Sequence, residues 1–435
     1  MSSNAPLNSI SRYFGLTRSV TESMMFRFVG LLLVFLLHLI LARLMGPKEY
    51  GYYSIITSWL SILLVVSLFG MDKAVLRFFP SALAKNDYGM AAGFLRFSRI
   101  LILVLSFICG VCAFLVILDK SRNGLVNFSE GFFWALFLLP LLAMVYQGAA
   151  VLRSYNRIKA SMLPVYILLP VFLSIAVAIY YYQHHRLSVD AVMFLQLGCT
   201  FLVMLWVRRM VRRKMDPLIG EATPEIEPRV WLSVASAFFL SSIIEMLLKQ
   251  SDILMVGYLM SHVRAGEYSA ASRITSLIAF GISVSDYLYM PKITALYVSG
   301  KKRALQEMVR TSARQIMGLT LPLMVLLVLS GPWLLAAFGP TFKKAYIPML
   351  ILLAGQLVNA ATGLSGALLT MAGNRNSYVL YSFVSFVFQI FFMLLLVPVW
   401  GLSGAAVSAA LARILLNFLA YRHVRTKIGI TASVW

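Results

Sequence analysis

Three ionisable residues interrupt the apolar stretch 231–259 of this chain: Glu245, Lys249 and Asp252. Their spacings of four and then three residues place all three side chains on one face of an α-helix. In a bilayer, a charged residue at the middle of a helix costs about 2.5–3.5 kcal/mol on insertion scales. Each of them therefore requires either a partner of opposite charge or a function such as ligand binding.

Two arginines, Arg273 and Arg413, lie in other apolar stretches. By the rise of a helix, Asp252 and Arg273 would lie at similar depth and could meet. In one interpretation these charges only neutralise one another and hold helices together. In the other, Lys249, Arg273 and Arg413 line a cavity for an anionic ligand. The second is favoured, because these cations outnumber the carboxylates of Glu245 and Asp252.

Arg77 is a further candidate for binding an anionic headgroup. Together with Asp72 and Lys73 it follows the end of an apolar stretch. At such a position these side chains either meet a ligand or extend along the apolar surface to the membrane interface.

Glu245, Asp252 and His38 are the candidate carriers of a coupling ion, either H⁺ or Na⁺. An isolated histidine in an apolar stretch can relay a proton, but it more often hydrogen-bonds to a neighbouring helix. The sequence contains no glycine-rich phosphate-binding loop, so we expect no nucleotide hydrolysis. We expect no cofactor and no metal site, and the C-x-x-C spacing of Cys109 and Cys112 is interpreted as a pair of buried apolar thiols.

The composition places these residues in a membrane protein. The chain has 435 residues and a net charge of +22, with 60% hydrophobic and only 12% charged residues. Soluble domains carry about 25% charged residues, so this chain could not cover its surface with polar side chains. A strongly basic chain normally suggests nucleic acid as a partner, but here the apolar stretches are too long for that function. The sequence predicts an integral membrane protein without large extramembrane domains.

Stretches of about 20 mostly apolar residues predict twelve transmembrane helices. They cover 24–45, 51–71, 94–118, 130–152, 160–182, 188–210, 231–259, 267–291, 308–330, 346–371, 377–398 and 401–422. The predicted organisation is a cytoplasmic segment 1–23, a six-helix lobe 24–210, a cytoplasmic linker 211–230, a second six-helix lobe 231–422 and a cytoplasmic tail 423–435. Aromatic residues at the ends of the helices are interpreted as an interfacial belt: Tyr50, Tyr52, Tyr53, Trp231, Trp333 and Trp400.

The distribution of basic residues predicts the orientation. With a cytoplasmic N-terminus, a large majority of the 38 Lys and Arg residues fall in cytoplasmic segments. Cytoplasmic loops carry such an excess, so both termini are predicted to be cytoplasmic.

The two halves of the sequence resemble each other. Glu49-Tyr50 matches Glu267-Tyr268, Arg96 matches Arg314, and Asn156-Arg157 matches Asn374-Arg375, all at one sequence offset. These pairs predict a duplicated unit of six helices. Because six is even, both copies share one orientation, which gives a parallel repeat typical of transporters.

The first hairpin, Leu41-Ala42-Arg43-Leu44-Met45-Gly46-Pro47-Lys48-Glu49-Tyr50-Gly51, resembles the polysaccharide-export and oligosaccharide flippase family. That family belongs to the multidrug/oligosaccharidyl-lipid/polysaccharide flippase superfamily. The segments Ser251–Gly257, Gly266–Ala271 and Pro398–Ala406 look like its second-half and last-hairpin counterparts.

The resemblance implies two six-helix lobes around a central cavity, as in multidrug and toxic compound extrusion (MATE) transporters. It implies that the chain is a flippase and not an enzyme. Its substrate would be an undecaprenyl-pyrophosphate-linked oligosaccharide, flipped across a bacterial inner membrane for surface polysaccharide synthesis by alternating access. Membrane lipids and the polysaccharide polymerase and chain-length machinery would be its partners, and nucleic acid would not.

Two alternatives remain open. A cation-coupled multidrug extruder of the same fold would want acidic residues in the first lobe, where Asp72 lies only at a helix end. A membrane enzyme acting on the same glycolipids would need a sizeable outer loop with catalytic residues, whereas the predicted outer connections are short.

Overall fold

The computed structural model describes residues 5–122, 130–155, 157–219 and 222–431. The helices of the first half are α1 (Ala5–Leu68), α2 (Met71–Ala84), α3 (Tyr88–Arg122), α4 (Glu130–Ser154), α5 (Ile158–Leu163), η1 (Pro164–Leu168), α6 (Leu169–His184) and α7 (Val189–Ile219). Those of the second half are α8 (Pro228–Leu259), α9 (His262–Val298), α10 (Lys302–Phe338), η2 (Pro340–Ala345), α11 (Tyr346–Ala361), α12 (Ser365–Met371), α13 (Arg375–His423) and η3 (Val424–Ile428). No strand occurs among the described residues, which confirms the all-α prediction.

Nine segments of the described chain are long and apolar enough to cross a membrane. Two of them, Met25–Ala84 and Arg375–Ile428, contain 60 and 54 residues. Each is long enough for two crossings of about 20 residues. The turn in the first lies at Gly46 (φ 76°, ψ 172°) and the turn in the second at Gly401 (φ 58°, ψ −131°), conformations that suit glycine. The chain is a multi-pass membrane protein, while the number twelve and the orientation stay predictions.

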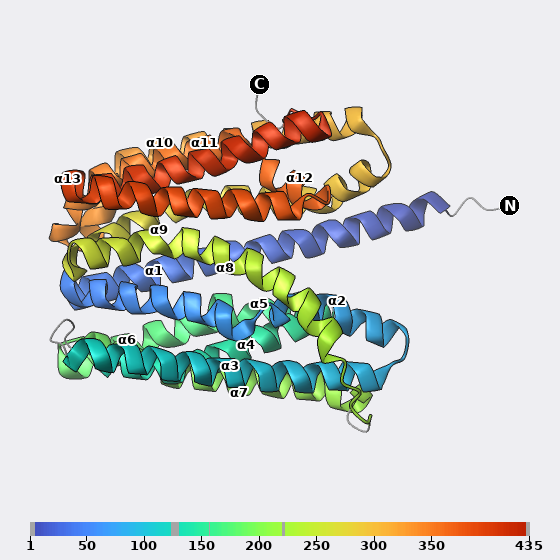
Figure 1. The fold of residues 1–435 in the computed structure, drawn as a ribbon, viewed down its shortest axis with the longest axis horizontal. Helices are drawn as coiled ribbons and strands as arrows, with labels where there is room; N and C mark the ends of the chain where they lie inside the picture. The colour runs from blue at the N-terminus through green and yellow to red at the C-terminus, as the bar shows by residue number, and fades with distance from the viewer. Residues whose placement is uncertain (1–4, 123–129, 156, 220–221, 432–435) are drawn as a thin grey trace.

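The helices form two bundles with α1 and α8 between them (Figure 1). Helices α2–α7 lie on one side, and α9–α13 lie on the other. Helix α1 packs extensively on both α8 and α9. Helix α8 crosses from one bundle to the other: at its start, Trp231 packs against Phe94 with ring centroids 5.3 Å apart, and farther along α8 packs on α13. Contacts between the bundles therefore run mainly through α1 and α8.

Two of the predicted membrane helices are interrupted. The stretch 160–182 contains the π-helical turn Pro164–Leu168, beside prolines that remove backbone donors. The stretch 346–371 breaks between α11 and α12, where Gly363 has φ 54°. By contrast, helices α7 and α8 extend into the predicted linker, to Ile219 and from Pro228.

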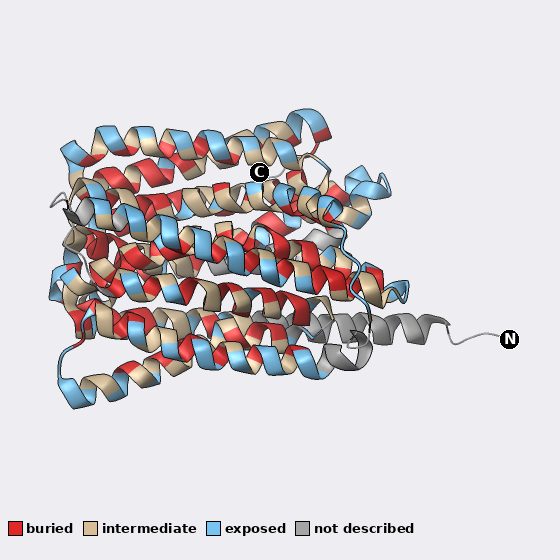
Figure 2. Cartoon of the chain, turned by 60° about the horizontal axis from the view of Figure 1, so that its bottom comes forward, coloured by how far each residue is buried: buried red, intermediate tan, exposed pale blue. Residues whose placement is uncertain are grey.

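Buried and exposed residues alternate along the same helices (Figure 2), as expected when one helix face packs on neighbours and the other meets lipid. Trp333 (74% exposed) and Trp400 (57%) lie on the surface, and for them the interfacial belt stays a prediction. For Tyr50, Tyr53 and Trp231 it is wrong, because their exposed fractions are 0%, 3% and 0%. The first two belong instead to the site described next.

Candidate functional site

Three basic residues converge near the middle of the molecule. Lys249 on α8 has Arg273 on α9, Arg413 on α13 and Asp252 as its electrostatic neighbours. Lys249 is exposed, whereas Arg273 and Arg413 are half-buried. We call Lys249, Arg273 and Arg413 the central cations. The structure thus brings together the three cations that the sequence singled out, with one carboxylate among them.

Asp252 is the carboxylate of this cluster, and it is 8% exposed. The hydroxyl of Tyr268 donates to one of its oxygens at 3.2 Å, and the N–H of Ile253 donates to the other at 2.8 Å. Its cationic neighbours are Arg413 and Lys249. The expected meeting of Asp252 with Arg273 is therefore wrong: Tyr268 and Arg413 take that place.

Arg273 faces the first half of the chain instead, next to His38, Tyr50 and Tyr53. Its Nε is buried and has no hydrogen-bond partner among the described residues. An unpartnered buried donor on a cation costs free energy, so this N–H is available to an anionic acceptor.

His38 is 6% exposed and hydrogen-bonds through Nδ1 with the hydroxyl of Tyr50 at 3.2 Å. This pair matches the Asp252–Tyr268 pair, because Tyr50 and Tyr268 are the equivalent tyrosines of the internal repeat. In each half, the tyrosine near the start of the second helix bonds an ionisable side chain of the preceding helix. The sequence identified the tyrosines as marks of the repeat but did not identify this role. The repeated Glu-Tyr dipeptide is the sequence feature from which this role could have been predicted.

Aromatic rings from both halves pack around Tyr50, at the end of the molecule that is predicted to face outward. The ring of Tyr50 lies 6.5 Å from that of Phe338 and 5.9 Å from that of Phe342. Phe35 packs edge-on against Phe338 at 5.8 Å. Tyr50, Phe338 and Phe342 are all fully buried, so this aromatic layer excludes water.

The two halves also touch closely at their first turns. A methyl group on Gly51 would overlap the carbonyl oxygen of His262, and one on Gly266 would overlap that of Pro47. Between them the rings of Tyr52 and His262 stack at 4.0 Å. We call Gly51, Gly266, Tyr52 and His262 the outer contact. It holds α1 and α9 together at the end of the molecule that is predicted to face outward.

Two predicted site residues lie outside the central cluster. Glu245 is exposed on α8 and forms no ion pair with a described residue. Arg77 is exposed on α2, with its guanidinium 5.9 Å from the ring centroid of Phe78. Neither is among the electrostatic neighbours of Lys249.

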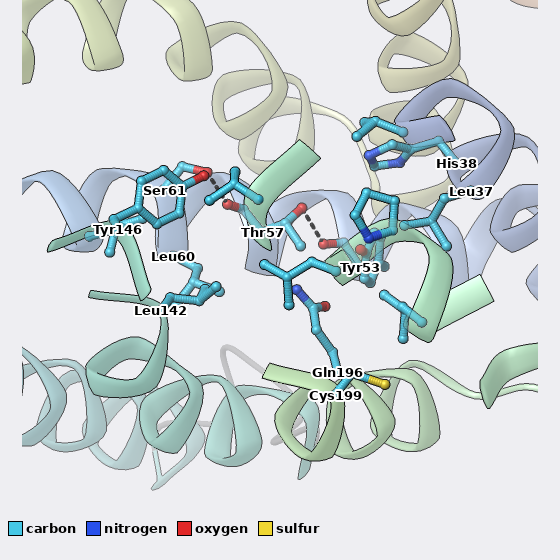
Figure 3. A pocket seen from close by; sticks show the side chains of 16 residues that line it. Leu37, His38, Tyr53, Thr57, Leu60, Ser61, Leu142, Tyr146, Gln196 and Cys199 are labelled. Carbon is cyan, nitrogen blue, oxygen red and sulfur yellow. Dashed lines mark hydrogen bonds between the residues drawn. The ribbon is translucent and has the colours of Figure 1, made fainter. Parts of the chain in front are cut away.

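A separate cavity of about 240 Å³ lies within the first bundle (Figure 3). Its lining is mostly apolar, with His38, Tyr146 and Gln196 among the polar exceptions. Thr57 and Ser61 direct their hydroxyls to carbonyls of their own helix, at 2.8 and 2.7 Å, whereas Oε1 of Gln196 is buried without a hydrogen-bond partner among the described residues. His38 borders both this cavity and the aromatic layer.

Residues 40–346 match the protein family described as polysaccharide biosynthesis protein. A relative in sequence is an uncharacterized membrane protein of Methanocaldococcus jannaschii, which is 22% identical over 417 residues, 90% of this chain and 80% of the relative.

Among solved structures, an inward-facing multidrug resistance MATE transporter of the MOP superfamily superposes with a TM-score of 0.76 at 14% identity, covering 92% of this chain and 94% of that one. An outward-facing MATE transporter gives 0.60 at 15% identity, covering 94% and 95%. The MATE multidrug transporter DinF-BH gives 0.66 at 18% identity, covering 95% of both chains. These likenesses confirm the predicted MATE-like fold.

Proposed function

This chain belongs to the polysaccharide biosynthesis protein family, and we propose that it is a flippase for a lipid-linked oligosaccharide. The substrate is an oligosaccharide on a polyprenyl pyrophosphate carrier such as undecaprenyl pyrophosphate. It moves from the cytoplasmic to the outer leaflet of a bacterial inner membrane by alternating access. The product serves surface polysaccharide synthesis, whose polymerase and chain-length machinery are the proposed partners.

The observation that carries this proposal is the excess of positive charge at the centre of the molecule. Asp252 is the carboxylate neighbour of Lys249 and Arg413, and it already accepts two hydrogen bonds. The cluster therefore keeps a net positive charge in a region of low dielectric. Pyrophosphate and acidic sugars supply the opposite charge, and guanidinium groups bind phosphate oxygens in a bidentate geometry.

The conformation fits the stage of alternating access in which the transporter binds its substrate from the cytoplasmic side. The outer contact and the aromatic layer close the outward end, while the superposition is better with an inward-facing transporter than with an outward-facing one. We infer an inward-facing state, in which the central cations await a substrate from the cytoplasmic leaflet.

Flipping is tested with the purified protein in proteoliposomes that contain a fluorescent polyprenyl-pyrophosphate sugar, by quenching the label that reaches the far leaflet. We expect wild-type protein to flip the lipid, and Arg273→Gln and Arg413→Gln to lose most of the rate. Arg186→Gln and Lys343→Gln, at exposed positions that are predicted to face outward, are the matched controls. A catalytic role for the outer connections predicts the reverse pattern. No flipping by the wild-type protein overturns the proposal.

In cells, deletion of the gene tests the pathway. Accumulation of a complete lipid-linked repeat unit facing the cytoplasm supports flipping, and unchanged glycolipids contradict it.

We propose that a gradient of H⁺ or Na⁺ drives transport, with Glu245, Asp252 and His38 as candidate carriers. Asp252 and His38 are buried and bonded to equivalent tyrosines, an arrangement that suits protonation in one state only. Flipping that is insensitive to collapse of both gradients contradicts this part of the proposal.

A further inference from the structure

A second pair of cations lies at the cytoplasmic end of the space between the two bundles. Lys73 is in the first turn of α2, and Arg375 is the first residue of α13. One comes from each bundle, and both reach the same segment of α8. The Nζ of Lys73 donates to the hydroxyl of Ser242 at 2.6 Å, and Nη2 of Arg375 donates to the hydroxyl of Ser241 at 2.6 Å.

We call Lys73, Arg375, Ser241 and Ser242 the junction. Its hydrogen bonds run from each cation to a serine hydroxyl and from that hydroxyl to a backbone carbonyl. Both serine hydroxyls donate to the carbonyl of Phe238, at 3.0 and 2.8 Å, so each offers only lone pairs to the cation. Arg375 also lies 4.5 Å from the ring centroid of Phe238. Helix α8 is held against the first bundle at the same height, because the ring of Phe69 stacks on that of Phe239 at 4.8 Å. The two cations are therefore positioned by neutral groups.

Neither cation forms an ion pair with a described residue. Asp72, which is next in sequence to Lys73, has Lys73 and Arg153 as electrostatic neighbours without an ion pair to either. Both cations also stand in the first turn of a helix, where the positive end of the helix dipole disfavours a basic side chain. An anion at this junction would relieve that repulsion.

The depth of the junction matches that of a lipid headgroup. Along α8, Ser242 lies about 25 Å from Leu259 at the outer end, by the rise of 1.5 Å per residue. The hydrocarbon core is about 30 Å thick, so the junction is near its cytoplasmic edge. Ser242 and Lys249 are two helical turns apart, so they share one face of α8 about 10 Å from each other along the axis. The exposed carboxylate of Glu245 lies on that face between the two positions, so the junction is a site distinct from the central cations.

We propose that Lys73 and Arg375, held in place by the hydroxyls of Ser241 and Ser242, form the first binding site for the phosphate group of a lipid-linked substrate. This rests on the proposed function. The phosphate enters from the cytoplasmic leaflet at headgroup depth and is held between the two bundles. From the junction it moves on to the central cations. Phosphate oxygens are stronger acceptors than hydroxyl oxygens, so both cations turn to the ligand without losing a better partner.

The experiment uses the full chain in nanodiscs of phosphatidylcholine, titrated with a polyprenyl pyrophosphate that carries no sugar, with binding followed by native mass spectrometry. We expect the Lys73→Gln/Arg375→Gln double variant to bind the probe at least about tenfold more weakly, since each cation makes a charge-assisted bond. The charge-retaining Lys73→Arg and Arg375→Lys variants keep most of the affinity. Lys85→Gln and Arg303→Gln, exposed cations of the two bundles, are the controls that bind as wild type.

Three binding results overturn the inference. The first is wild-type affinity in a folded double variant, as judged by its thermal unfolding and gel filtration. The second is equal competition by phosphatidylglycerol, which would make the junction a site for bulk anionic lipid. Inorganic pyrophosphate should compete weakly with the probe, because it lacks the lipid anchor that brings the phosphate to this depth; competition as strong as that of the lipid also counts against the inference.

A failure of the phosphate site can be distinguished from a failure of the proposed flippase function. If the double variant loses binding while wild-type proteoliposomes do not flip, the site stands and the flippase proposal falls. If wild type and double variant flip the lipid equally, the flippase proposal stands and this site falls.

Discussion

At the scale of single residues, the Asp252–Tyr268 bond places a carboxylate inside the membrane without an ion pair. Asp252 is 8% exposed and its partner Tyr268 is fully buried. Removing a hydrogen-bond donor from a buried polar group costs about 1–3 kcal/mol, more for a charged group. We therefore expect Tyr268→Phe to lower the free energy of unfolding by that amount and to lower the midpoint of thermal unfolding in detergent.

Tyr258→Phe is the matched control, because Tyr258 lies on α8 and is 78% exposed. An exposed substitution of this kind changes stability by less than about 0.5 kcal/mol. Equal unfolding midpoints for the two variants would show that the bond from Tyr268 contributes nothing.

The sequence predicted which residues carry the charge but not which of them meet. Lys249, Arg273 and Arg413 stood out because a charge within an apolar stretch is costly wherever the helix is placed. Their partners depend on how each helix is rotated about its axis, and hydropathy does not determine that rotation. For this reason Asp252 was paired with Arg273 and not with Tyr268 and Arg413. Tyr50 was assigned to the membrane interface for the same reason.

At the scale of secondary-structure elements, most helices were predictable because a bilayer leaves backbone groups no alternative to internal hydrogen bonds. The π-helical turn at Pro164–Leu168 and the break at Gly363 were not predicted as such. Prolines and glycines mark positions where a helix can break, whereas the packing of neighbouring helices decides which of them do.

The crossing of α1 and α9 depends on glycine at its closest point. A side chain at position 51 would overlap the carbonyl oxygen of His262, so Gly51→Val must push the two helices apart. We expect about 1–3 kcal/mol of lost stability from this overpacking. We also expect a shift of the population away from the closed outer end, seen as faster labelling of a cysteine at position 54 or 269 by a water-soluble maleimide.

Gly198→Ala is the control for this substitution, because nothing lies within 4 Å of the methyl group that it adds. It should be neutral, or stabilise α7 by up to about 1 kcal/mol, since glycine is unfavourable within a helix. If Gly51→Val matches this control in both measurements, the close crossing is not what holds the outer end shut.

At the scale of the whole molecule, equivalent positions of the two repeats serve different purposes. Both contribute a glycine to the outer contact, and Tyr50 and Tyr268 bond His38 in one half and Asp252 in the other. The cations are concentrated in the second half. The outer contact and the central cations are thus both built on the same repeated arrangement of helices. Because the outer contact joins the two repeats, an opening towards the outside must separate it.

The outer contact predicts a pH dependence of that opening. Burial first, and then the charge of Lys48, lower the pKa of His262 from its ordinary value of 6.5. When α1 and α9 separate at the outer contact, His262 becomes exposed to water and its pKa rises towards 6.5. The closed state is therefore stabilised fully above about pH 6.5, and this stabilisation is lost as the pH falls below 6.5 towards the lowered pKa. Acidification should shift the population towards the outward-open state.

We expect the distance distribution between spin labels at Arg186→Cys and Lys344→Cys, in a background without native cysteines, to gain a longer component between about pH 7.5 and pH 5.5. His262→Asn should remove this change. His184→Asn should retain it, because His184 stacks on Tyr180 of its own helix at 4.2 Å and joins no second element. A longer component that persists in His262→Asn would assign the pH dependence to other groups, of which the buried pairs at His38 and Asp252 are the first to examine.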